Sequence, residues 1–278
     1  MTIKTVFLHA ASETLDPGRS AAHYALGLAR HFEAHLDALV LELDVVTPKS
    51  FYGRQIATDH RAQVRQRNAD VATAAAALRE AASTRGVDAT VITERSHIHS
   101  TPEIAADYAR LADIAVAGVC QEGLLSERTI AEALIFESGR PVLVVPVDHD
   151  TGFAARRIVV GWDYSRTAAR AVADALPLLR MAQDVTLVSF GDDKDFATSL
   201  SSEDVVAAIR RRGVECRFEQ MERRGREIGE AISNAAAERE ADLLVIGGFG
   251  HSRARSFVLG GATRTILAAP ALPTLFSH

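Results

Sequence analysis

Short apolar runs alternate with stretches of helical spacing along the whole chain, and they divide it into two halves of similar layout. Strands that alternate with helices predict a parallel sheet with right-handed crossovers. We therefore expect an α/β protein of two tandem flavodoxin-like (Rossmann-like) domains, each with a five-stranded, mostly parallel sheet and helices on both faces. The expected strands lie within 5–12, 36–43, 87–93, 112–118 and 141–146 of the first half and within 158–165, 185–190, 214–218, 241–247 and 273–276 of the second.

The two halves repeat each other at their strands. Thr5–Ser12 and Ile158–Ser165 each open from an apolar run into a polar turn, and Ala112–Gly118 and Ala241–Gly247 are each closed by glycine. Proline begins both closing runs, which suits an edge or terminal strand. The segment from Val147 to Arg156 is charged and aperiodic, as a linker is. We expect domains over 1–148 and 149–278.

The first half is longer between its second and third strands. The stretch from Ile56 to Thr84 is rich in alanine and arginine. It predicts an extended amphipathic helix with a solvated arginine face over an alanine packing stripe, and we assign it no ligand.

Composition narrows the class of protein. The 278 residues are 47% hydrophobic, which allows each half its own core. A net charge of -5 argues against general nucleic-acid binding. Cys120 and Cys216 form neither a disulfide framework nor a zinc motif. No apolar run approaches the ~20 residues of a membrane span, and the N-terminus lacks a signal sequence. We expect a cytoplasmic protein that binds neither membrane nor nucleic acid.

A glycine-rich segment directly after a buried strand carries the candidate chemistry. Gly247 and Gly250 lie at the carboxyl end of that strand, the edge at which open parallel sheets bind ligands. Gly260 and Gly261 precede a predicted helix, whose free N–H groups and dipole favour phosphate oxygens. Ala262 and Thr263 belong to its first turn, and the Thr263 hydroxyl adds a further donor.

Basic side chains lie on the loop between the two glycine clusters. His251, Arg253 and Arg255 could donate charge-assisted hydrogen bonds to a polyphosphate or to a partner's carboxylate. Simple solvent exposure of these side chains explains them equally well.

The spacing Gly247-x2-Gly250-x9-Gly260 resembles the G-x2-G-x9-G-[S/T] signature of ATP-binding universal stress proteins. The resemblance covers both halves in strand order and implies an adenine nucleotide alpha hydrolase-like fold. It further implies that Asp163, in a D-x-S pattern with Ser165, contacts the nucleoside. It implies that a residue of the second strand, for which Val188 is the candidate, reads adenine through its backbone. Gly261 departs from the pattern, because it stands where the family has Ser or Thr.

Each of these residues also has a purely structural interpretation. Glycines permit tight turns and close packing of a helix on a sheet. Asp163 and Ser165 are residue types that cap a helix N-terminus, and the next helix is expected near Arg166.

The first half lacks the pattern. The positions equivalent to Asp163 and Gly250 hold Ala10 and Gln121. Of the glycine and D-x-S pattern, the first half keeps only Gly118 and Ser12. The helix start at Glu127 and Thr129 puts a carboxylate where phosphate would lie. We predict that this half does not bind ATP and serves as a built-in dimer partner. The resemblance implies that the closing strands pair across the interface; further homodimerisation stays open.

These observations predict a stress-response or regulatory protein, not an enzyme. Its second half is expected to bind ATP or another adenine nucleotide, with or without Mg²⁺, and to act on an unknown protein partner. The alternatives are an interaction scaffold with a structural glycine loop, or a slow ATPase, although no Walker motif is present.

Two other sites are weaker alternatives. A hydrolase would use Ser252, but no acid follows it and His278 is the sole later histidine. His97 and His99, with His9 or His60, could bind a metal, but they lack a third close ligand and are read as ordinary histidines.

Overall fold

A computed structural model gives the fold of the chain. It describes residues 2–10, 17–18, 20–43, 69–96, 100–119, 127–192, 198–248, 250–251 and 258–278.

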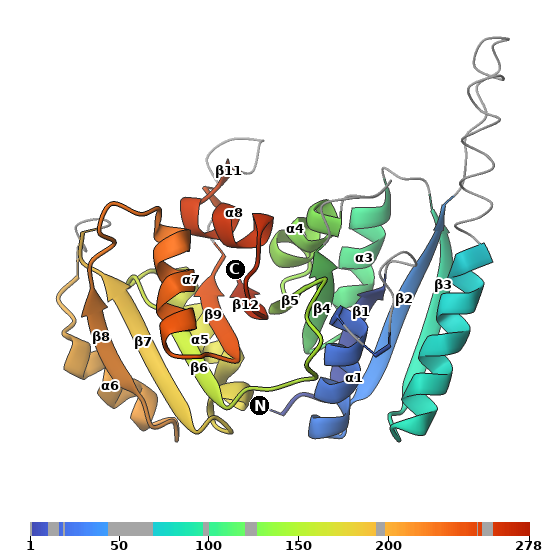
Figure 1. The fold of residues 1–278 in the computed structure, drawn as a ribbon, viewed down its shortest axis with the longest axis horizontal. Helices are drawn as coiled ribbons and strands as arrows, with labels where there is room; N and C mark the ends of the chain where they lie inside the picture. Colours follow the sequence, from blue (N-terminus) through green and yellow to red (C-terminus); the bar gives the residue numbers. More distant parts are fainter. Residues whose placement is uncertain are drawn as a thin grey trace, which may run out of the picture.

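The described strands form a ten-stranded sheet and a separate two-stranded hairpin (Figure 1). The order in the large sheet is β3-β2-β1-β4-β5-β12-β9-β6-β7-β8. Every pair is parallel except β5–β12, and β10–β11 form the antiparallel hairpin. The strands are β1 Thr5–Ala10, β2 His35–Leu43, β3 Ala89–Ser96, β4 Ile114–Val119, β5 Val142–Pro146, β6 Arg157–Gly161, β7 Asp184–Phe190, β8 Arg217–Met221, β9 Leu243–Gly247, β10 Gly250–His251, β11 Val258–Leu259 and β12 Thr274–Ser277.

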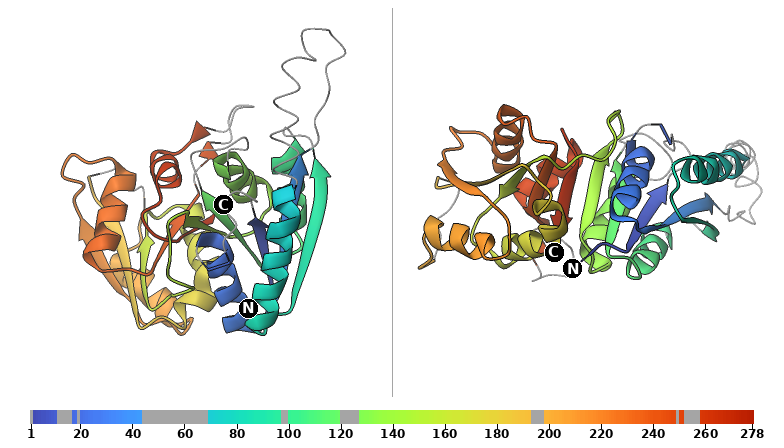
Figure 2. Two further views of the ribbon diagram at one scale, coloured as in Figure 1. Left: turned by 45° about the vertical axis from the view of Figure 1, so that its right-hand side comes forward. Right: turned by 90° about the horizontal axis from the view of Figure 1, so that it is seen from below.

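Helices cover both faces of the sheet, as the view from below in Figure 2 shows. One face carries α1, α5, α6 and a helix over 69–84; the other carries α3, α4, α7 and α8. This confirms the predicted α/β fold. The labelled helices are α1 Ser20–Phe32, α3 Thr101–Ala109, α4 Glu127–Glu137, α5 Arg166–Leu179, α6 Ser202–Arg210, α7 Ile228–Glu238 and α8 Gly261–Ala268.

Two predicted elements need adjustment. The strand expected over 214–218 is β8, which begins at Arg217, where its pairing with β7 starts. Val214 and Cys216 lie before the strand, and their burial accounts for the apolar pattern that suggested an earlier start. Of the long helix expected from Ile56 to Thr84, residues 69–84 are helical and bury Val71, Ala75 and Leu78 on one side. The rest of that stretch lies outside the described residues.

The two halves join at the β5–β12 pair. Thr274, Leu275 and Phe276 face Val144, Leu143 and Val142 in antiparallel register. The pairing of the closing strands is the arrangement that the family resemblance implied. It turns two five-stranded sheets into one continuous sheet.

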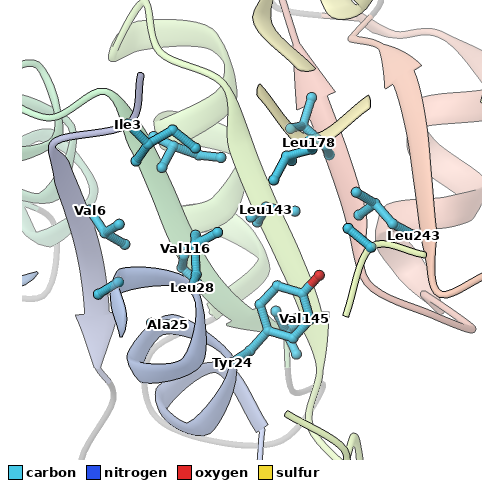
Figure 3. Close-up of a cluster of buried hydrophobic side chains, with 14 of the residues drawn as sticks. Ile3, Val6, Tyr24, Ala25, Leu28, Val116, Leu143, Val145, Leu178 and Leu243 are labelled. Atoms are coloured by element: carbon cyan, nitrogen blue, oxygen red, sulfur yellow. The ribbon is translucent and has the colours of Figure 1, made fainter. Parts of the chain in front are cut away.

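The core is continuous across this junction. In Figure 3, Leu143 and Val145 of β5 lie between side chains of the first half, such as Tyr24 and Leu28, and side chains of the second half, such as Leu178 and Leu243. Burial of apolar surface is the main favourable term in folding, so this shared core couples the two halves energetically.

The segment between β5 and β6 packs against α1, which its sequence did not indicate. The Ser20 N–H donates to the His149 carbonyl at 2.6 Å, and the Tyr24 hydroxyl donates to the Ala154 carbonyl at 3.3 Å. The Phe153 ring lies against Tyr24 with centroids 5.4 Å apart. Gly27 makes room for it, since a Cβ there would lie 3.0 Å from the Phe153 Cβ.

This packing predicts a pH dependence of stability. Burial lowers the pKa of the His149 imidazole, although the nearby Asp150 opposes the shift. The unfolded chain therefore takes up this proton at a higher pH than the folded chain does. The His149 contribution to stability is fully present above pH ~6.5 and is lost as the pH falls below it.

The comparison is between the wild type and His149→Gln, by urea unfolding from pH 7.5 to 5. We expect the wild type to lose more stability on acidification than the variant does. Equal slopes of unfolding free energy against pH would contradict the burial of a neutral His149.

Candidate functional site

The candidate site lies at the carboxyl ends of the central strands of the second half. β6 and β9 are neighbours, with Val160 opposite Val245, so the turn after β6 and the glycine-rich segment after β9 meet at one edge of the sheet. In Figure 1, α8 and β11 lie above the end of β9. This is the edge at which open parallel sheets bind ligands.

The turn after β6 is held by its own side chains. The Ser165 N–H donates to Asp163 Oδ1 at 3.0 Å. Ser165 is the N-cap of α5, and its Oγ accepts from the Ala168 N–H at 3.1 Å. Tyr164 between them has a φ of 57°, a left-handed conformation that a tyrosine adopts only under constraint. The side chains of Asp163 and Ser165 therefore have the structural role, in the turn and the helix N-cap, that their residue types indicated.

Gly247 is required by packing. A Cβ at this position would lie 2.6 Å from the Thr167 carbonyl carbon and 2.7 Å from the Ala168 nitrogen. The first turn of α5 thus rests directly on the end of β9. This contact brings the α5 N-terminus next to the glycine-rich segment.

The hairpin brings the remaining glycines together. Gly250 in β10 pairs with Leu259 in β11, the residue before Gly260. Gly260 is the N-cap of α8 in an extended conformation (φ -62°, ψ 154°), with no side-chain cap. The first intrahelical bond runs from the Arg264 N–H to the Gly260 carbonyl at 3.0 Å. The N–H groups of Gly261 and Ala262 precede it and have no partner within the helix, as at any helix start.

The residues of the first α8 turn differ in exposure. Gly261 is exposed, whereas the Thr263 side chain is fully buried. The helix turns Thr263 toward the interior, so the prediction that its hydroxyl adds a donor for phosphate concerns a buried side chain and stays a prediction. His251 lies in β10, while Arg253 and Arg255 lie outside the described residues.

Val188 is not placed to read a base through its backbone. Its carbonyl accepts the Trp162 N–H at 2.9 Å within the sheet. Alternate residues of a strand direct their backbone groups to the same side. The backbone N–H and C=O of Phe190 therefore also point toward the β6 side. β6 ends at Gly161, opposite Val188, so these groups lie beyond the end of that strand. Phe190 is thus a candidate that the sequence did not indicate, because its position depends on strand register.

A cavity of about 750 Å³ lies next to this strand end. Its walls come from the ends of β7 and β8, the loop after β8 and α7. Phe190, Gly191, Arg224 and Arg226 are among the residues that line it. The candidate site thus has open space beside it.

The comparison with protein families is decisive for the second half. Residues 154–277 match the universal stress protein family. This half is a universal stress protein domain. Among curated proteins, none shows significant sequence similarity to the chain.

Solved structures share the fold of the whole chain. A universal stress protein from Archaeoglobus fulgidus DSM 4304 has a TM-score of 0.66 and 14% identity, covering 98% of this chain and 97% of its own. A functionally unknown protein from Pseudomonas aeruginosa PAO1 has a TM-score of 0.55 and 13% identity, covering 99% of this chain and 92% of its own. Both structures therefore share the fold of the chain over nearly its whole length, including both halves.

The first half differs from the universal stress protein domain at the matching edge. Its α4 begins at Glu127, whose side chain is only 5% exposed. Glu127 Oε2 lies 3.9 Å from the position of a Cβ at Gly118, the counterpart of Gly247. A carboxylate thus fills the place beside the strand end. Ala10, at the end of β1, offers no polar side chain, and Gln121 lies outside the described residues.

Within the described residues no group of three or more histidine, cysteine or acidic side chains is arranged to hold a metal ion. His60, His97 and His99 lie outside these residues. The same part of the chain has no helix with the length and apolar character that a membrane crossing requires.

Proposed function

We propose that the universal stress protein domain binds ATP or a related adenine nucleotide and acts in the cytoplasm as a regulatory, non-catalytic protein. The observation that carries the proposal is the uncapped N-terminus of α8, which the β10–β11 hairpin holds beside Gly250. Backbone N–H groups and a helix dipole together attract phosphate. The glycine spacing that resembles the ATP-binding signature supports the same ligand.

The neighbouring groups suggest an orientation for the nucleotide. Its phosphates would face Gly260, Gly261 and Ala262, and the ribose would lie at Asp163. The base would then reach the end of β7, where the backbone of Phe190 can exchange hydrogen bonds with it. The adjacent cavity supplies the room that a base needs. Mg²⁺ would accompany the phosphates from solution.

The first half is proposed not to bind nucleotide. The buried Glu127 side chain at the start of α4 occupies the place beside Gly118 where phosphate would lie in the second half. We expect one site per chain.

The test is isothermal titration of ATP and AMP into the purified chain, with mass spectrometry of any ligand retained from expression. About one nucleotide per chain is expected, and ATP should bind more tightly than AMP because of its extra phosphates. The absence of both heat and retained ligand would overturn the proposal in favour of the interaction scaffold. Measurable ATP turnover would refute the non-catalytic part alone.

Asp163→Ala should weaken ATP binding by about 5- to 20-fold, because it removes a hydrogen bond to the ribose, about 1–2 kcal/mol in such sites. Asp107→Ala, at an exposed position of α3 in the first half, is the control and should leave the affinity within about twofold. If the Asp163 variant binds ATP as the wild type does, the carboxylate has only its turn-stabilising role.

Gly261→Ser should strengthen ATP binding by about 2- to 10-fold, the contribution of one hydrogen bond. The position can accept the change, since a Cβ there would meet only Ile228 Cγ2 at 3.7 Å. Gly261→Ala is the control, because it adds the Cβ without the hydroxyl. Equal affinities of the serine and alanine variants would show that no phosphate lies at this position.

A further inference from the structure

A second cavity lies on the opposite face of the second half, between α5 and α6. It measures about 430 Å³ and is lined mostly by apolar side chains, among them Val172 of α5, Val205 and Ile209 of α6, and Leu200 before α6. Leu200 is 54% exposed. Pockets that bind small molecules have about this volume and a predominantly apolar lining with a few polar groups.

Two further kinds of side chain line this cavity. The first is the indole of Trp162, which lines it and whose Nε1 is buried with no hydrogen-bond partner in the described part of the chain. Because this atom has almost no accessible surface, the indole ring and not its N–H borders the cavity. The second is the pair Arg211 and Arg212 at the C-terminal end of α6, both exposed and without a described ion pair.

The one carboxylate at the cavity is already engaged. Asp204 accepts hydrogen bonds from the Ser201 N–H at 3.0 Å and the Ser201 hydroxyl at 2.9 Å, as part of the capping box of α6. Its charge also interacts electrostatically with Arg211. The cavity therefore has an apolar interior and a rim on which two arginines outnumber one carboxylate.

We propose that this cavity binds a small carboxylic acid with an apolar body, such as a medium-chain fatty acid. The hydrocarbon part would lie against Val172, Val205 and Ile209. The carboxylate would pair with Arg211 and Arg212 at the rim, and the hydrocarbon would also contact the indole ring of Trp162. The cavity lies on the α5–α6 face, and its proposed ligand does not depend on nucleotide binding.

The protein provides its own probe, because Trp162 is the only tryptophan in the chain. The experiment is titration of the full chain with sodium octanoate and with 1-octanol, followed by the emission of Trp162. We expect a saturable change with both ligands and at least tenfold tighter binding of octanoate, because octanol lacks the charge. Equal affinities, or no saturable change with octanoate, would overturn the proposal.

Variants separate charge from shape. Arg211→Gln/Arg212→Gln should reduce the octanoate affinity to within about threefold of that for octanol. Arg30→Gln, at an exposed position of α1 in the first half, is the control and should change neither affinity. An unchanged octanoate affinity in the double variant would overturn the assignment of the carboxylate.

Two further variants test the interior. Leu200→Ser alters an exposed side chain, so it should fold normally, and it should weaken both ligands by at least threefold. Trp162→Ala, measured by isothermal titration, should weaken octanoate by at least threefold through loss of the contact between the indole ring and the hydrocarbon. Unchanged binding of octanoate in both variants would show that the ligand lies elsewhere and would overturn the site.

Discussion

Replacement of Phe276 by alanine is expected to lower the free energy of unfolding by about 3–5 kcal/mol. Phe276 lies in β12 and is fully buried, among the largest side chains with no exposed area. It pairs with Val142 of the first half and with Ile246 of the second. Its truncation therefore leaves a cavity at the junction of the two halves, which close packing prevents from collapsing fully.

Urea unfolding followed by circular dichroism measures this change. Leu111→Ala is the matched control, because Leu111 is 79% exposed and its truncation should change the free energy by no more than about 0.5 kcal/mol. A loss below about 1 kcal/mol in the Phe276 variant would show that the junction is not a packed core.

Replacement of Gly260 by glutamate is expected to weaken ATP binding by about 10- to 100-fold. Gly260 has a φ of -62°, which any residue adopts, so the change should not strain the backbone. The new carboxylate would lie at the N-cap of α8 and compete with phosphate for the same N–H groups. Hydrogen bonds to a charged group contribute about 1.5–3 kcal/mol, which sets the expected range.

Titration calorimetry measures the affinity, and thermal melting checks the fold. Gly260→Ser is the matched control, because serine is a favoured N-cap without a charge and should keep the affinity within about threefold. If glutamate at this position leaves ATP binding unchanged, the phosphates do not lie at α8 and the proposed orientation is wrong. An identical loss in the serine variant would point to a steric effect and not to charge.

Most strands could be predicted because their signal is local. The run from Ala241 to Gly247 is apolar and closed by glycine, as a strand buried on both faces is. The position predicted for β8 was too early in the chain. β8 is an edge strand whose side chains are half exposed, so the buried Val214 and Cys216 just before it gave the stronger apolar signal. The packing of Phe153 on α1 had no local signal, since one aromatic residue in an aperiodic segment predicts no partner.

The residues of the candidate site also differ in whether a local sequence pattern predicts them. The glycine spacing and the D-x-S turn are readable from the sequence, because tight turns and helix starts restrict residue types over a few positions. Val188 was chosen by residue type, but the direction of a backbone group depends on register, which places Phe190 and not Val188 at the open strand end. The burial of Thr263 likewise depends on how α8 is rotated against its neighbours.

The sequence by itself determined the alternation of strands and helices, the repeat of the two halves and the glycine-rich segment after β9. These features follow from burial and backbone geometry over a few residues. Only the tertiary structure decided that β5 and β12 join the halves into one sheet. It also decided that the first turn of α5 packs directly on Gly247 and that the Glu127 side chain lies beside Gly118 at the matching edge of the first half. Each of these contacts joins residues far apart in the chain, whose packing no local pattern encodes.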